Sequence, residues 1–475
     1  MVGRYAEKKS LNGILKKKTS SFLAVTGRRR IGKTYLIDTH FKSNMCFRFT
    51  GIQNASFSKQ INNFTNKLKE YSTDEIRNTP KTWQDALFLL KQYLKTLDKS
   101  KKQVIFIDEL PWVSTSKSGF LQLLAHLWND YLSKEKHFIL VVCGSASSWL
   151  TKHIINDTGG LHNRLTDLIH LQPFTLSETK SFLNSLSIKL NTNEVAKLYM
   201  TFGGVPYYLE QVRKGESVAL AIERICFSHS GVLKNEYDNL YKALFKNPSS
   251  HEAIVKVLAQ KLSGLGRGEI IAKSKIKSGG NYNRTIDELV QSGFVTEFIP
   301  FGRKKRGVMY RLNDEFSIFY HKFMVGNKNY SNGMWLQLSA SQAYKIWLGF
   351  AFENLCLKHI DEIKKELGIS GVYSEVSSYR VAGNKTEKGF QIDLLIDRKD
   401  DVINLCEMKY YSTAYKIDKA YAKALEEKRQ RFIENSKTKK RVINTLITNN
   451  GLAENEHSLA VVDTEIELEA LFRAV

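Results

Sequence analysis

Two charged residues interrupt an apolar segment near the C-terminal end of the chain, in the stretch INLCEMKYY (403–411). In an extended strand successive side chains point to opposite faces, so Glu407 and Lys409 share one face with Leu405. The residues between them lie on the other face. A salt-bridged surface strand would explain the pair, but a carboxylate and an ammonium at this spacing also suit phosphate chemistry.

The segment before it supplies a second carboxylate. GFQIDLLID is a further apolar strand, joined to the first by a polar turn at 398–401. A four-residue turn places Asp393 opposite residue 406, one step from Glu407, and such cross-strand neighbours are roughly 5 Å apart. Asp393 and Glu407 would supply hard oxygen ligands for Mg²⁺, and Lys409 would orient or deprotonate the attacking water. The spacing therefore predicts a divalent-metal nuclease site.

A second candidate site lies near the N-terminus, in SFLAVTGRRRIGKTYLI (21–37). An apolar strand precedes a loop with the pattern G-x-x-x-x-G-K-[ST], and a helix follows. The backbone N–H groups of such a loop wrap phosphate, Lys33 reaches the β- and γ-phosphates, and Thr34 ligates Mg²⁺. The residues predicted to bind the nucleotide are Gly27, Arg28, Arg29, Arg30, Ile31, Gly32, Lys33, Thr34 and Tyr35.

A matching acidic pair ends the segment QVIFIDEL (103–110). Four apolar residues before Asp108 and Glu109 are typical of a buried parallel strand. Asp108 would hold Mg²⁺ through water, and Glu109 would polarise the water that attacks the γ-phosphate. The alternative is that both residues only start the turn before Pro111. Because the two motifs occur together and in the right order, they predict an ATP site.

The elements that must position these residues can be predicted from periodicity. Apolar segments at 45–49 and 138–145 suit further strands of the sheet that holds the ATP site. From His251 the pattern changes to three helices followed by two apolar strands. These elements are expected at 251–262, 267–275, 281–293, 294–301 and 307–312. Three helices with a basic hairpin predict a winged helix-turn-helix.

This winged helix carries 12 Lys and Arg against 5 Asp and Glu between residues 251 and 312. Asn283 and Arg284 lie early in the helix that usually enters the major groove of DNA. The tip of the wing is predicted to contact phosphates. It consists of Arg303, Lys304, Lys305 and Arg306. The alternative is that this domain packs against the ATPase and senses its state.

Residues 1–240 resemble the archaeal-type ATPase family, which is close to the AAA+ and STAND groups. The resemblance is carried by the two nucleotide motifs, by GRYAE at 3–7, and by GGVPYYL at 203–209, which is similar to the family's lid motif. It implies a helical lid, a polar sensor at Ser145 near the γ-phosphate, and a functional arginine at Arg164. Taken alone, Ser145 equally suits a helix N-cap, and Arg164 a surface salt bridge.

Residues 340–450 resemble the PD-(D/E)xK, restriction-endonuclease-like superfamily. The spacing D-x(13)-E-x-K described above carries this resemblance, together with Glu353 in the middle of an amphipathic helix at 345–360. The resemblance implies that Glu353 is a further metal ligand. Gln391 stands where relatives often have a glutamate, and many members of the superfamily have lost activity. The pattern therefore leaves cleavage and binding without cleavage both open.

The composition favours a soluble protein that binds a polyanion. The 475 residues are 42% hydrophobic, and 71 Lys and Arg against 48 Asp and Glu give a net charge of +23. Nucleic acid is the simplest such partner, although charge does not separate DNA from RNA. No segment approaches the roughly 20 apolar residues that cross a membrane. Five isolated cysteines suggest a reduced, cytoplasmic protein without a zinc site.

We therefore expect a multidomain protein. It would comprise an α/β P-loop NTPase with helical lid (1–240), an α-rich winged helix-turn-helix (241–335) and an α/β restriction-endonuclease-like domain (340–475). The expected function is that of an ATP-hydrolysing DNA-binding protein with a Mg²⁺-dependent DNA endonuclease domain. The resemblance also allows a homo-oligomer that forms through the ATPase domain. The alternative is a nucleotide-dependent signalling or scaffold ATPase whose C-terminal domain binds nucleic acid or protein without cleaving it.

Overall fold

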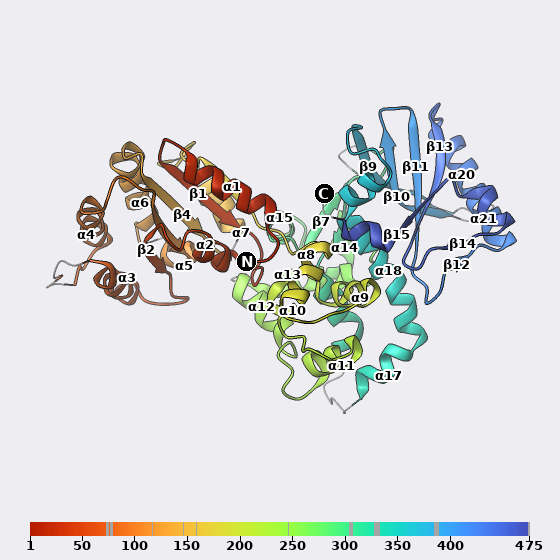
Figure 1. Ribbon diagram of the computed structural model, residues 1–475, viewed down its shortest axis with the longest axis horizontal. Coiled ribbons are helices and arrows are strands. Elements are labelled where there is room, and N and C mark those ends of the chain that lie inside the picture. Colours follow the sequence, from red (N-terminus) through yellow and green to blue (C-terminus); the bar gives the residue numbers. More distant parts are fainter. Residues whose placement is uncertain are drawn as a thin grey trace. The chain divides into compact units, whose positions relative to one another are not determined.

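Two sheets carry the residues discussed above, one in the first third of the chain and one near its C-terminus (Figure 1). They belong to a computed structural model of the chain. It describes residues 1–72, 76, 79–115, 117–145, 147–157, 159–245, 247–303, 307–326, 333–383 and 389–473. The chain divides into two compact units, Met1–Pro173 and Phe174–Val475. It is thus a multidomain α/β protein.

The first unit is built on a five-stranded parallel sheet with the order β2-β3-β4-β1-β5. The strands are β1 (Ser21–Thr26), β2 (Met45–Thr50), β3 (Gln103–Asp108), β4 (Phe138–Cys143) and β5 (Asp167–His170). Every residue of β1, β3 and β4 is buried, as expected of parallel strands that are covered on both faces. The strands predicted at 45–49, 103–108 and 138–145 are therefore confirmed.

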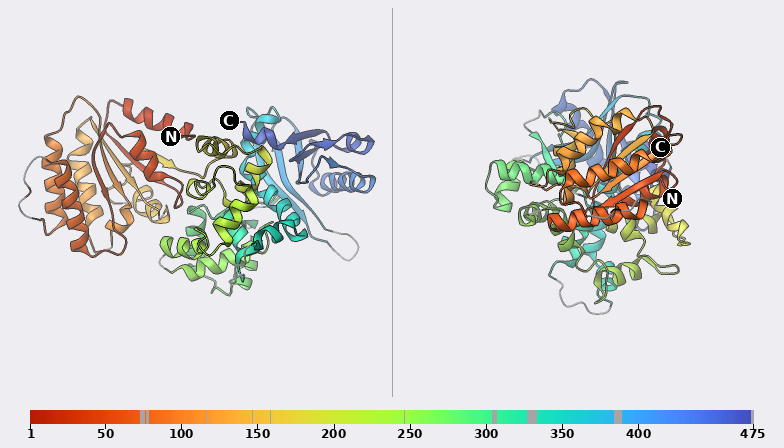
Figure 2. Two further views of the ribbon diagram at one scale, coloured as in Figure 1. Left: turned by 60° about the horizontal axis from the view of Figure 1, so that its bottom comes forward. Right: turned by 90° about the vertical axis from the view of Figure 1, so that its left-hand side faces the viewer.

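Helices cover both faces of this sheet (Figure 2). Leu11 of α1 and Ile37 of α2 pack in one apolar core, whereas Phe64 of α3, Leu90 of α4 and Leu124 of α6 pack in the other. The helices are α1 (Tyr5–Lys16), α2 (Lys33–His40), α3 (Phe57–Tyr71), α4 (Trp83–Lys95), α5 (Leu110–Val113), α6 (Phe120–Asp130) and α7 (Ser147–Leu150). The sheet is thus a rigid platform whose strand ends can position polar side chains.

The second unit begins with short helices. They are α8 (Leu176–Ser185), α9 (Thr192–Phe202), α10 (Pro206–Leu209), α11 (Val218–Ile222) and α12 (Glu236–Leu244). Reciprocal capping boxes start two of them, because Thr175 pairs with Glu178 at α8 and Asn191 with Glu194 at α9. Each box satisfies two backbone donors at the helix start.

Three helices and a small antiparallel sheet follow. The helices are α13 (Pro248–Ala259), α14 (Arg267–Ser274) and α15 (Gly280–Gln291). The strands are β6 (Leu265–Gly266), β7 (Val295–Phe298) and β8 (Met309–Leu312), in the order β6-β8-β7. The helices and the two long strands occupy the segments that periodicity predicted. The segment between β7 and β8 contains residues 304–306, which lie outside the described residues.

The C-terminal part is built on a five-stranded mixed sheet with the order β15-β13-β11-β10-β9. The strands are β9 (Ser374–Val381), β10 (Phe390–Arg398), β11 (Val402–Lys409), β13 (Arg441–Thr448) and β15 (Thr464–Glu467). Short strands β12 (Tyr415–Lys416) and β14 (Leu452–Ala453) pair separately. The helices from residue 315 onwards are α16 (Glu315–Phe319), α17 (Met334–Ala340), α18 (Gln342–Lys358), α19 (Ile360–Glu366), α20 (Lys419–Ser436) and α21 (Glu456–Val461).

One apolar core runs through the whole second unit. It joins Leu183 of α8, Leu258 of α13, Trp347 of α18 and Ile466 of β15. The residues predicted as separate lid, winged-helix and C-terminal domains therefore share buried surface. The proposed boundaries at 240 and 340 mark changes of element type within a continuous core.

The hairpin that carries the two predicted metal ligands differs from the prediction in register. Leu394 pairs with Cys406 and Ile396 with Asn404, so Asp393 and Glu407 each lie next to the pair Leu394–Cys406. The turn between the strands has three residues, 399–401, and Asp401 adopts a left-handed conformation with φ 62°. The predicted register is wrong by one residue, and both carboxylates adjoin the same cross-strand pair.

The same strand carries a β-bulge. The register between β10 and β9 shifts between Ile392 and Leu395. These two residues therefore share one apolar cluster, whereas Leu394 packs in the core on the other face. A bulge inserts an extra residue and re-aims the side chains around it. Asp393 lies at this irregularity.

Among the described residues, no helix has both the length and the apolar character that crossing a membrane requires.

Candidate functional site

The phosphate loop of the first unit has the backbone that its glycines allow. Gly27 has φ 135°, and a Cβ there would come within 2.4 Å of the Leu171 carbonyl oxygen and 2.6 Å of Ile31. Gly32 has φ 88° and Arg30 has φ 70°. Left-handed backbone and a close neighbour both require glycine at position 27. The loop is therefore wound tightly between β1 and α2.

Lys33 lies at the centre of this loop. Its ammonium donates hydrogen bonds to the carbonyl oxygens of Gly27 and Arg28, each at 2.8 Å. Burial lowers the pKa of Lys33, while Cys143, Glu109 and Asp108 oppose this effect. An enclosed ammonium without a partner carboxylate in direct contact suits an anionic ligand, because the anion would supply the missing charge.

Thr34 lies on α2, the helix that follows β1, and it meets Asp108 at the end of β3 although β4 lies between β1 and β3 in the sheet. The Thr34 hydroxyl donates to Oδ2 of Asp108 at 2.8 Å, and the backbone N–H of Glu109 donates to Oδ1 at 2.9 Å. Asp108 is buried. A hydroxyl beside a carboxylate is a donor set of hard oxygens, which fits Mg²⁺. These two predicted metal residues are thus brought together.

Glu109 and Ser145 are also in contact. The backbone N–H of Ser145 donates to Oε2 of Glu109 at 3.0 Å, and its hydroxyl donates to Oε1. Glu109 has left-handed backbone, with φ 49°, an unusual conformation for a residue with a side chain. The strained residue at the end of β3 and the serine after β4 thus form one polar group beside Asp108.

The remaining predicted residues of this site differ in exposure. Arg28 and Ile31 are buried, Arg29 and Arg30 are half-buried, and the Tyr35 side chain is 61% exposed. Arg164 is exposed in the turn that precedes β5. Among the described residues, no hydrogen bond or ion pair joins the Arg164 side chain to the phosphate loop.

Arg4 is a residue of this site that the pattern search did not single out. It is buried with φ 57°, and it donates to the Ile31 carbonyl at 3.0 Å and to the Gln172 carbonyl at 2.5 Å. Ser147 adds a second support, since its hydroxyl accepts from the Gly27 N–H at 3.1 Å. Both residues hold the loop from outside. The position of Arg4 within GRYAE was the available signal.

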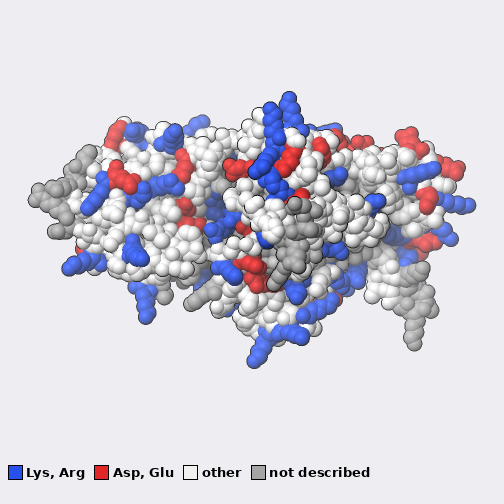
Figure 3. All heavy atoms as spheres, turned by 90° about the horizontal axis from the view of Figure 1, so that it is seen from below, with Lys and Arg blue, Asp and Glu red and all other residues white. Residues whose placement is uncertain are grey.

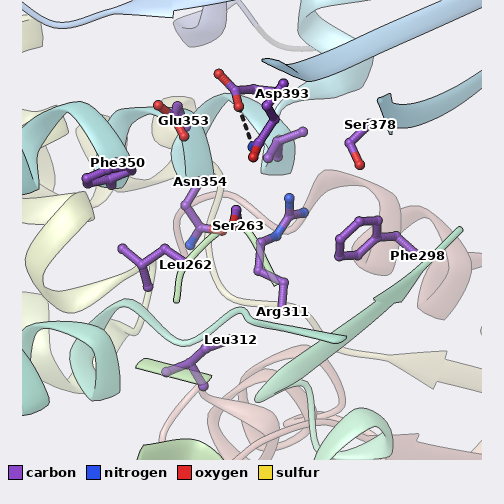
Figure 4. Close-up of a pocket in the computed structure, with 12 residues that line it drawn as sticks. Leu262, Ser263, Phe298, Arg311, Leu312, Phe350, Glu353, Asn354, Ser378 and Asp393 are labelled. Atoms are coloured by element: carbon purple, nitrogen blue, oxygen red, sulfur yellow. Dashed lines mark hydrogen bonds between the residues drawn. The ribbon is translucent and has the colours of Figure 1, made fainter. Parts of the chain in front are cut away.

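The carboxylate site of the second unit gathers three acidic residues from separate elements. Asp393 comes from β10 and Glu407 from the neighbouring strand β11, and Glu353 comes from α18. The Gln391 amide donates to Oδ1 of Asp393 at 2.7 Å. Figure 4 shows Glu353 and Asp393 close to one another at the same cavity.

The acids of this site destabilise one another's charged forms. Burial, together with Asp393 and Glu407, raises the pKa of Glu353 to about 8 against the opposing effects of Lys409 and Arg311. Burial and then Glu407 raise the pKa of Asp393. Enclosed carboxylates that repel each other favour a bound cation.

Cations of the chain itself surround Glu407. It pairs with Lys428, accepts from the Tyr421 hydroxyl at 3.4 Å, and lies 3.8 Å from the Lys409 ammonium. In the part of the chain that the structure describes, no three His, Cys, Asp or Glu side chains are gathered closely enough to hold a metal ion. The donor set therefore fits Mg²⁺ in chemistry, but Glu407 is neutralised by lysine.

Tyr421 and Lys428 were not among the predicted site residues. Both come from α20, the helix that follows the hairpin, and they are seven residues apart. Residues at this spacing lie on one face of a helix. That spacing, in a helix after the motif, was the signal that could have identified them.

The predicted nucleic-acid contacts lie at the surface where they are described. Arg284 is exposed in the first half of α15, and Arg303 is exposed after β7. Lys304, Lys305 and Arg306 lie outside the described residues. Figure 3 shows Lys and Arg side chains spread widely over one face, with fewer Asp and Glu between them.

Comparison with known sequences gives a family match for the first part of the chain. Residues 1–212 match the family described as an ATPase domain predominantly from Archaea. Among curated relatives, the uncharacterized protein MJECL04 of Methanocaldococcus jannaschii is 23% identical over 409 residues, which cover 84% of this chain and 85% of that protein. The uncharacterized ATP-binding protein MJ1659 of the same organism is 28% identical over 174 residues, which cover 36% of this chain and 46% of that protein.

Two solved structures give weaker likenesses. The Walker-type ATPase PABY2304 of Pyrococcus abyssi has 16% identity and a TM-score of 0.49, covering 68% of this chain and 96% of that one. The ORC2 protein of Aeropyrum pernix, in its ADPNP–ADP complexes, has 14% identity and a TM-score of 0.35, covering 66% of this chain and 90% of that one.

Proposed function

We propose that the archaeal-type P-loop ATPase domain carried by this chain controls a DNA-binding and DNA-cleaving second unit. The ATPase domain is the part that the family match covers, residues 1–212, and with it the chain is an ATP-binding protein of the ATPase type. The control of a winged helix and of a Mg²⁺-dependent endonuclease is the proposal.

The ATPase half of the proposal assigns a role to each contact in the first site. Lys33 binds the β- and γ-phosphates, exchanging two loop carbonyls for phosphate oxygens. Thr34 and Asp108 would hold Mg²⁺, which neutralises charge on the phosphates when it is bound. Glu109 orients the attacking water once it leaves the Ser145 hydroxyl and N–H. Ser145 thereby reports the nucleotide state to the residue that activates the water.

The nuclease half rests on one observation, that Asp393 and Glu407 lie beside the paired residues Leu394 and Cys406 and interact electrostatically, with Lys409 two positions on. Asp393 and Glu407 would hold Mg²⁺, with Glu353 close by, and the ion would stabilise charge on the scissile phosphate when it is bound. Lys409 lies on the same strand face as Glu407 and would orient the attacking water or accept its proton.

The winged helix supplies the DNA-binding part of the proposal. Arg284 is exposed on α15, the helix that would enter the major groove, and Arg303 lies at the start of the wing. The strong positive charge of the chain supports binding to a polyanion. The same features suit RNA, which the experiment below distinguishes by substrate.

The test is cleavage and melting of the full-length protein with and without Mn²⁺. The parent should nick supercoiled DNA and should melt at a higher temperature when Mn²⁺ is present, because the ion binds the folded state. Asp393→Ala and Glu407→Ala should lose both effects. Lys409→Ala should keep much of the melting shift and lose cleavage, since it is assigned to the water and not to the metal.

The controls separate the two halves of the proposal. ATP hydrolysis should be unchanged in all three variants, and an RNA of equal length should be cleaved less than DNA. A parent protein that hydrolyses ATP but shows neither a Mn²⁺ shift nor nicking would end the nuclease assignment.

One observation favours a second candidate function. Glu407 already pairs with Lys428, and a carboxylate neutralised in this way is a less ready metal ligand. A second unit that binds nucleic acid or protein without cleaving it, under control of the ATPase, would keep this pair. In that case Lys428→Ala should weaken the fold without creating metal affinity.

A further inference from the structure

Arg311 reaches from the small antiparallel sheet toward the carboxylate site. It lies on β8, opposite Thr296 of β7, and its guanidinium carbon is 5.3 Å from the centre of the Phe298 ring. Figure 4 shows its side chain pointing toward the cavity that Glu353 and Asp393 line. A residue of the predicted winged helix thus belongs to the surroundings of the predicted nuclease site.

The guanidinium is enclosed without being fully paired. Its Nε atom is buried and has no hydrogen-bond partner among the described residues. Neither Glu353 nor Asp393 forms an ion pair with Arg311 within 4.0 Å in the described part of the chain. Burial lowers the pKa of Arg311 to about 10, and the two acids oppose this effect. It stays charged at neutral pH, so an uncompensated donor faces the site.

Space separates this cation from the acids. A small cavity of about 20 Å³ is lined by Arg311, Glu353 and Asp393 together with Ser263 and Ser378. That is more than the roughly 10–15 Å³ that one water needs. A larger cavity of about 410 Å³ shares Glu353 and Asp393 in its lining and is bordered by Lys261 and Lys322. A ligand that enters the larger cavity can therefore reach the acids, and Arg311 lines the adjoining small cavity that shares them.

Packing fixes the sheet that carries Arg311. The backbone N–H of Phe301 donates to the Ser378 carbonyl on β9 at 2.8 Å. The Phe301 ring packs against Tyr379 and Phe432, with centroids 6.2 and 5.6 Å apart. These contacts join β7 and its following turn to the C-terminal sheet. Arg311 therefore belongs to a sheet that is packed in place, and its backbone is a fixed part of the cavity lining.

We propose that Arg311 is the residue that binds the substrate's phosphate at the carboxylate site, so that the site is composite and is completed by the small antiparallel sheet. The inference rests on the proposed nuclease function and names its phosphate-binding group. Asp393 and Glu407 would hold a metal ion on one side of a phosphodiester, and the Arg311 guanidinium, whose Nε is unpaired among the described residues, would hold its free oxygens on the other side. A guanidinium binds such oxygens in a forked geometry that an ammonium cannot reproduce.

Two measurements on the full-length protein test this proposal. The first is nicking of supercoiled DNA in Mn²⁺, in which Arg311→Gln should lower the rate about a hundredfold, the usual cost of removing one donor to a developing negative charge. The second is binding of a fluorescein-labelled eight-nucleotide thymidylate strand in Ca²⁺, followed by anisotropy. Arg311→Gln should weaken this binding about tenfold.

The controls exclude a merely structural role. Arg441→Gln removes the same charge from an exposed position at the other end of the sheet, and it should leave both measurements within twofold of the parent. Arg311→Gln should keep the Mn²⁺ melting shift, because Arg311 is not a metal ligand. Arg311→Lys keeps the charge without the fork, so it should fold like the parent and show an intermediate loss. It replaces the Gln variant if that variant is unfolded.

Each outcome decides the proposal. Parental nicking and binding in the Arg311 variants would overturn it and leave the nuclease function standing. Loss of the Mn²⁺ shift together with binding would also overturn it, since Arg311 would then support the acids and not the phosphate. If the parent does not nick at all, the nuclease function falls, and the anisotropy measurement alone accepts or rejects Arg311 as the phosphate-binding residue.

Discussion

The contact between Glu109 and Ser145 separates nucleotide binding from hydrolysis at the level of single side chains. Lys33 donates to the loop carbonyls and would bind phosphate, whereas Glu109 accepts two hydrogen bonds from Ser145 and, in the described part of the chain, forms no hydrogen bond with the loop. Replacement of Lys33 should therefore impair nucleotide binding, whereas replacement of Glu109 should impair hydrolysis.

Lys33→Ala should abolish tight ATP binding, because it removes the only ammonium at the centre of the loop. Glu109→Gln should bind ATP with nearly parental affinity and hydrolyse it at least about a hundredfold more slowly, since water activation is lost and phosphate affinity is not. Equilibrium binding of a fluorescent ATP analogue and release of inorganic phosphate measure the two effects. Lys42→Ala, at an exposed position just after α2, is the matched control. Unchanged hydrolysis in both variants would show that the site is misassigned.

Strand alternation and motif spacing were enough to predict which residues surround each site. They were not enough to predict the local geometry. The three-residue turn with left-handed Asp401 moved the hairpin register by one residue, and the bulge at Asp393 broke the alternation of faces. Both features depend on backbone conformations that residue type alone does not impose.

Contacts that come from distant elements were beyond a sequence pattern. Arg311 approaches the acids because β8 docks on the C-terminal sheet, 42 positions before Glu353 in the chain. No local spacing marks such a residue, since its role depends on how two sheets pack. Lys428 and Tyr421 are intermediate cases. Their spacing in the sequence predicts a shared helix face, but no sequence pattern identifies Glu407 as their partner.

His359 links two elements of the second unit and makes their packing sensitive to acid. Its Nε2 accepts from the Leu176 N–H at the start of α8 at 3.0 Å, and its Nδ1 donates to the Leu355 carbonyl of α18 at 2.8 Å. Burial lowers the pKa of His359 to about 4. The Nε2 contact needs the neutral ring, because a proton on Nε2 would face an N–H donor, whereas Nδ1 can donate in either form.

The sign of the effect follows from the lowered pKa. Below the ordinary pKa of 6.5 the unfolded chain binds a proton that the folded unit refuses, so stability is lost as the pH falls from about 6.5 to about 4. The loss amounts to roughly 3 kcal/mol for this residue. Urea unfolding gives the free energy of unfolding of the second unit at each pH in this range. A plot of that free energy against pH should have a shallower slope for His359→Gln than for the parent.

Carboxylates contribute to the slope in both proteins, so the difference between the two isolates His359. His229→Gln, at an exposed position of the same unit, should keep the parental slope. Equal slopes for His359→Gln and the parent would contradict a neutral buried ring.

The charge of the whole molecule predicts a strong dependence of nucleic-acid binding on salt. With 71 basic and 48 acidic residues, most surfaces attract phosphate without selecting a sequence. The wing should contribute localised contacts beyond this background. Replacing its four basic residues by alanine should flatten the plot of log affinity against log salt by about 0.9 for each lost phosphate contact. The residues are Arg303, Lys304, Lys305 and Arg306.

A charge-matched variant distinguishes local contacts from net charge. It replaces four exposed lysines of the first unit, Lys9, Lys16, Lys18 and Lys42. Affinity for a 20-base-pair duplex, measured between 50 and 300 mM salt, should fall less steeply with salt for the wing variant than for this one. An equal change in both would assign the wing to contacts within the protein.

The continuous apolar core of residues 174–475 limits how this gene can be shuffled during evolution. A recombination that separated the chain near residue 340 would expose the α18 side of the core, where Trp347 and Phe352 are buried, and the fragments would aggregate. The boundary at residue 173 has no such cost, because the first unit has cores of its own. Recombination during evolution should therefore exchange the ATPase unit, residues 1–173, as a whole, while residues 174–475 stay together.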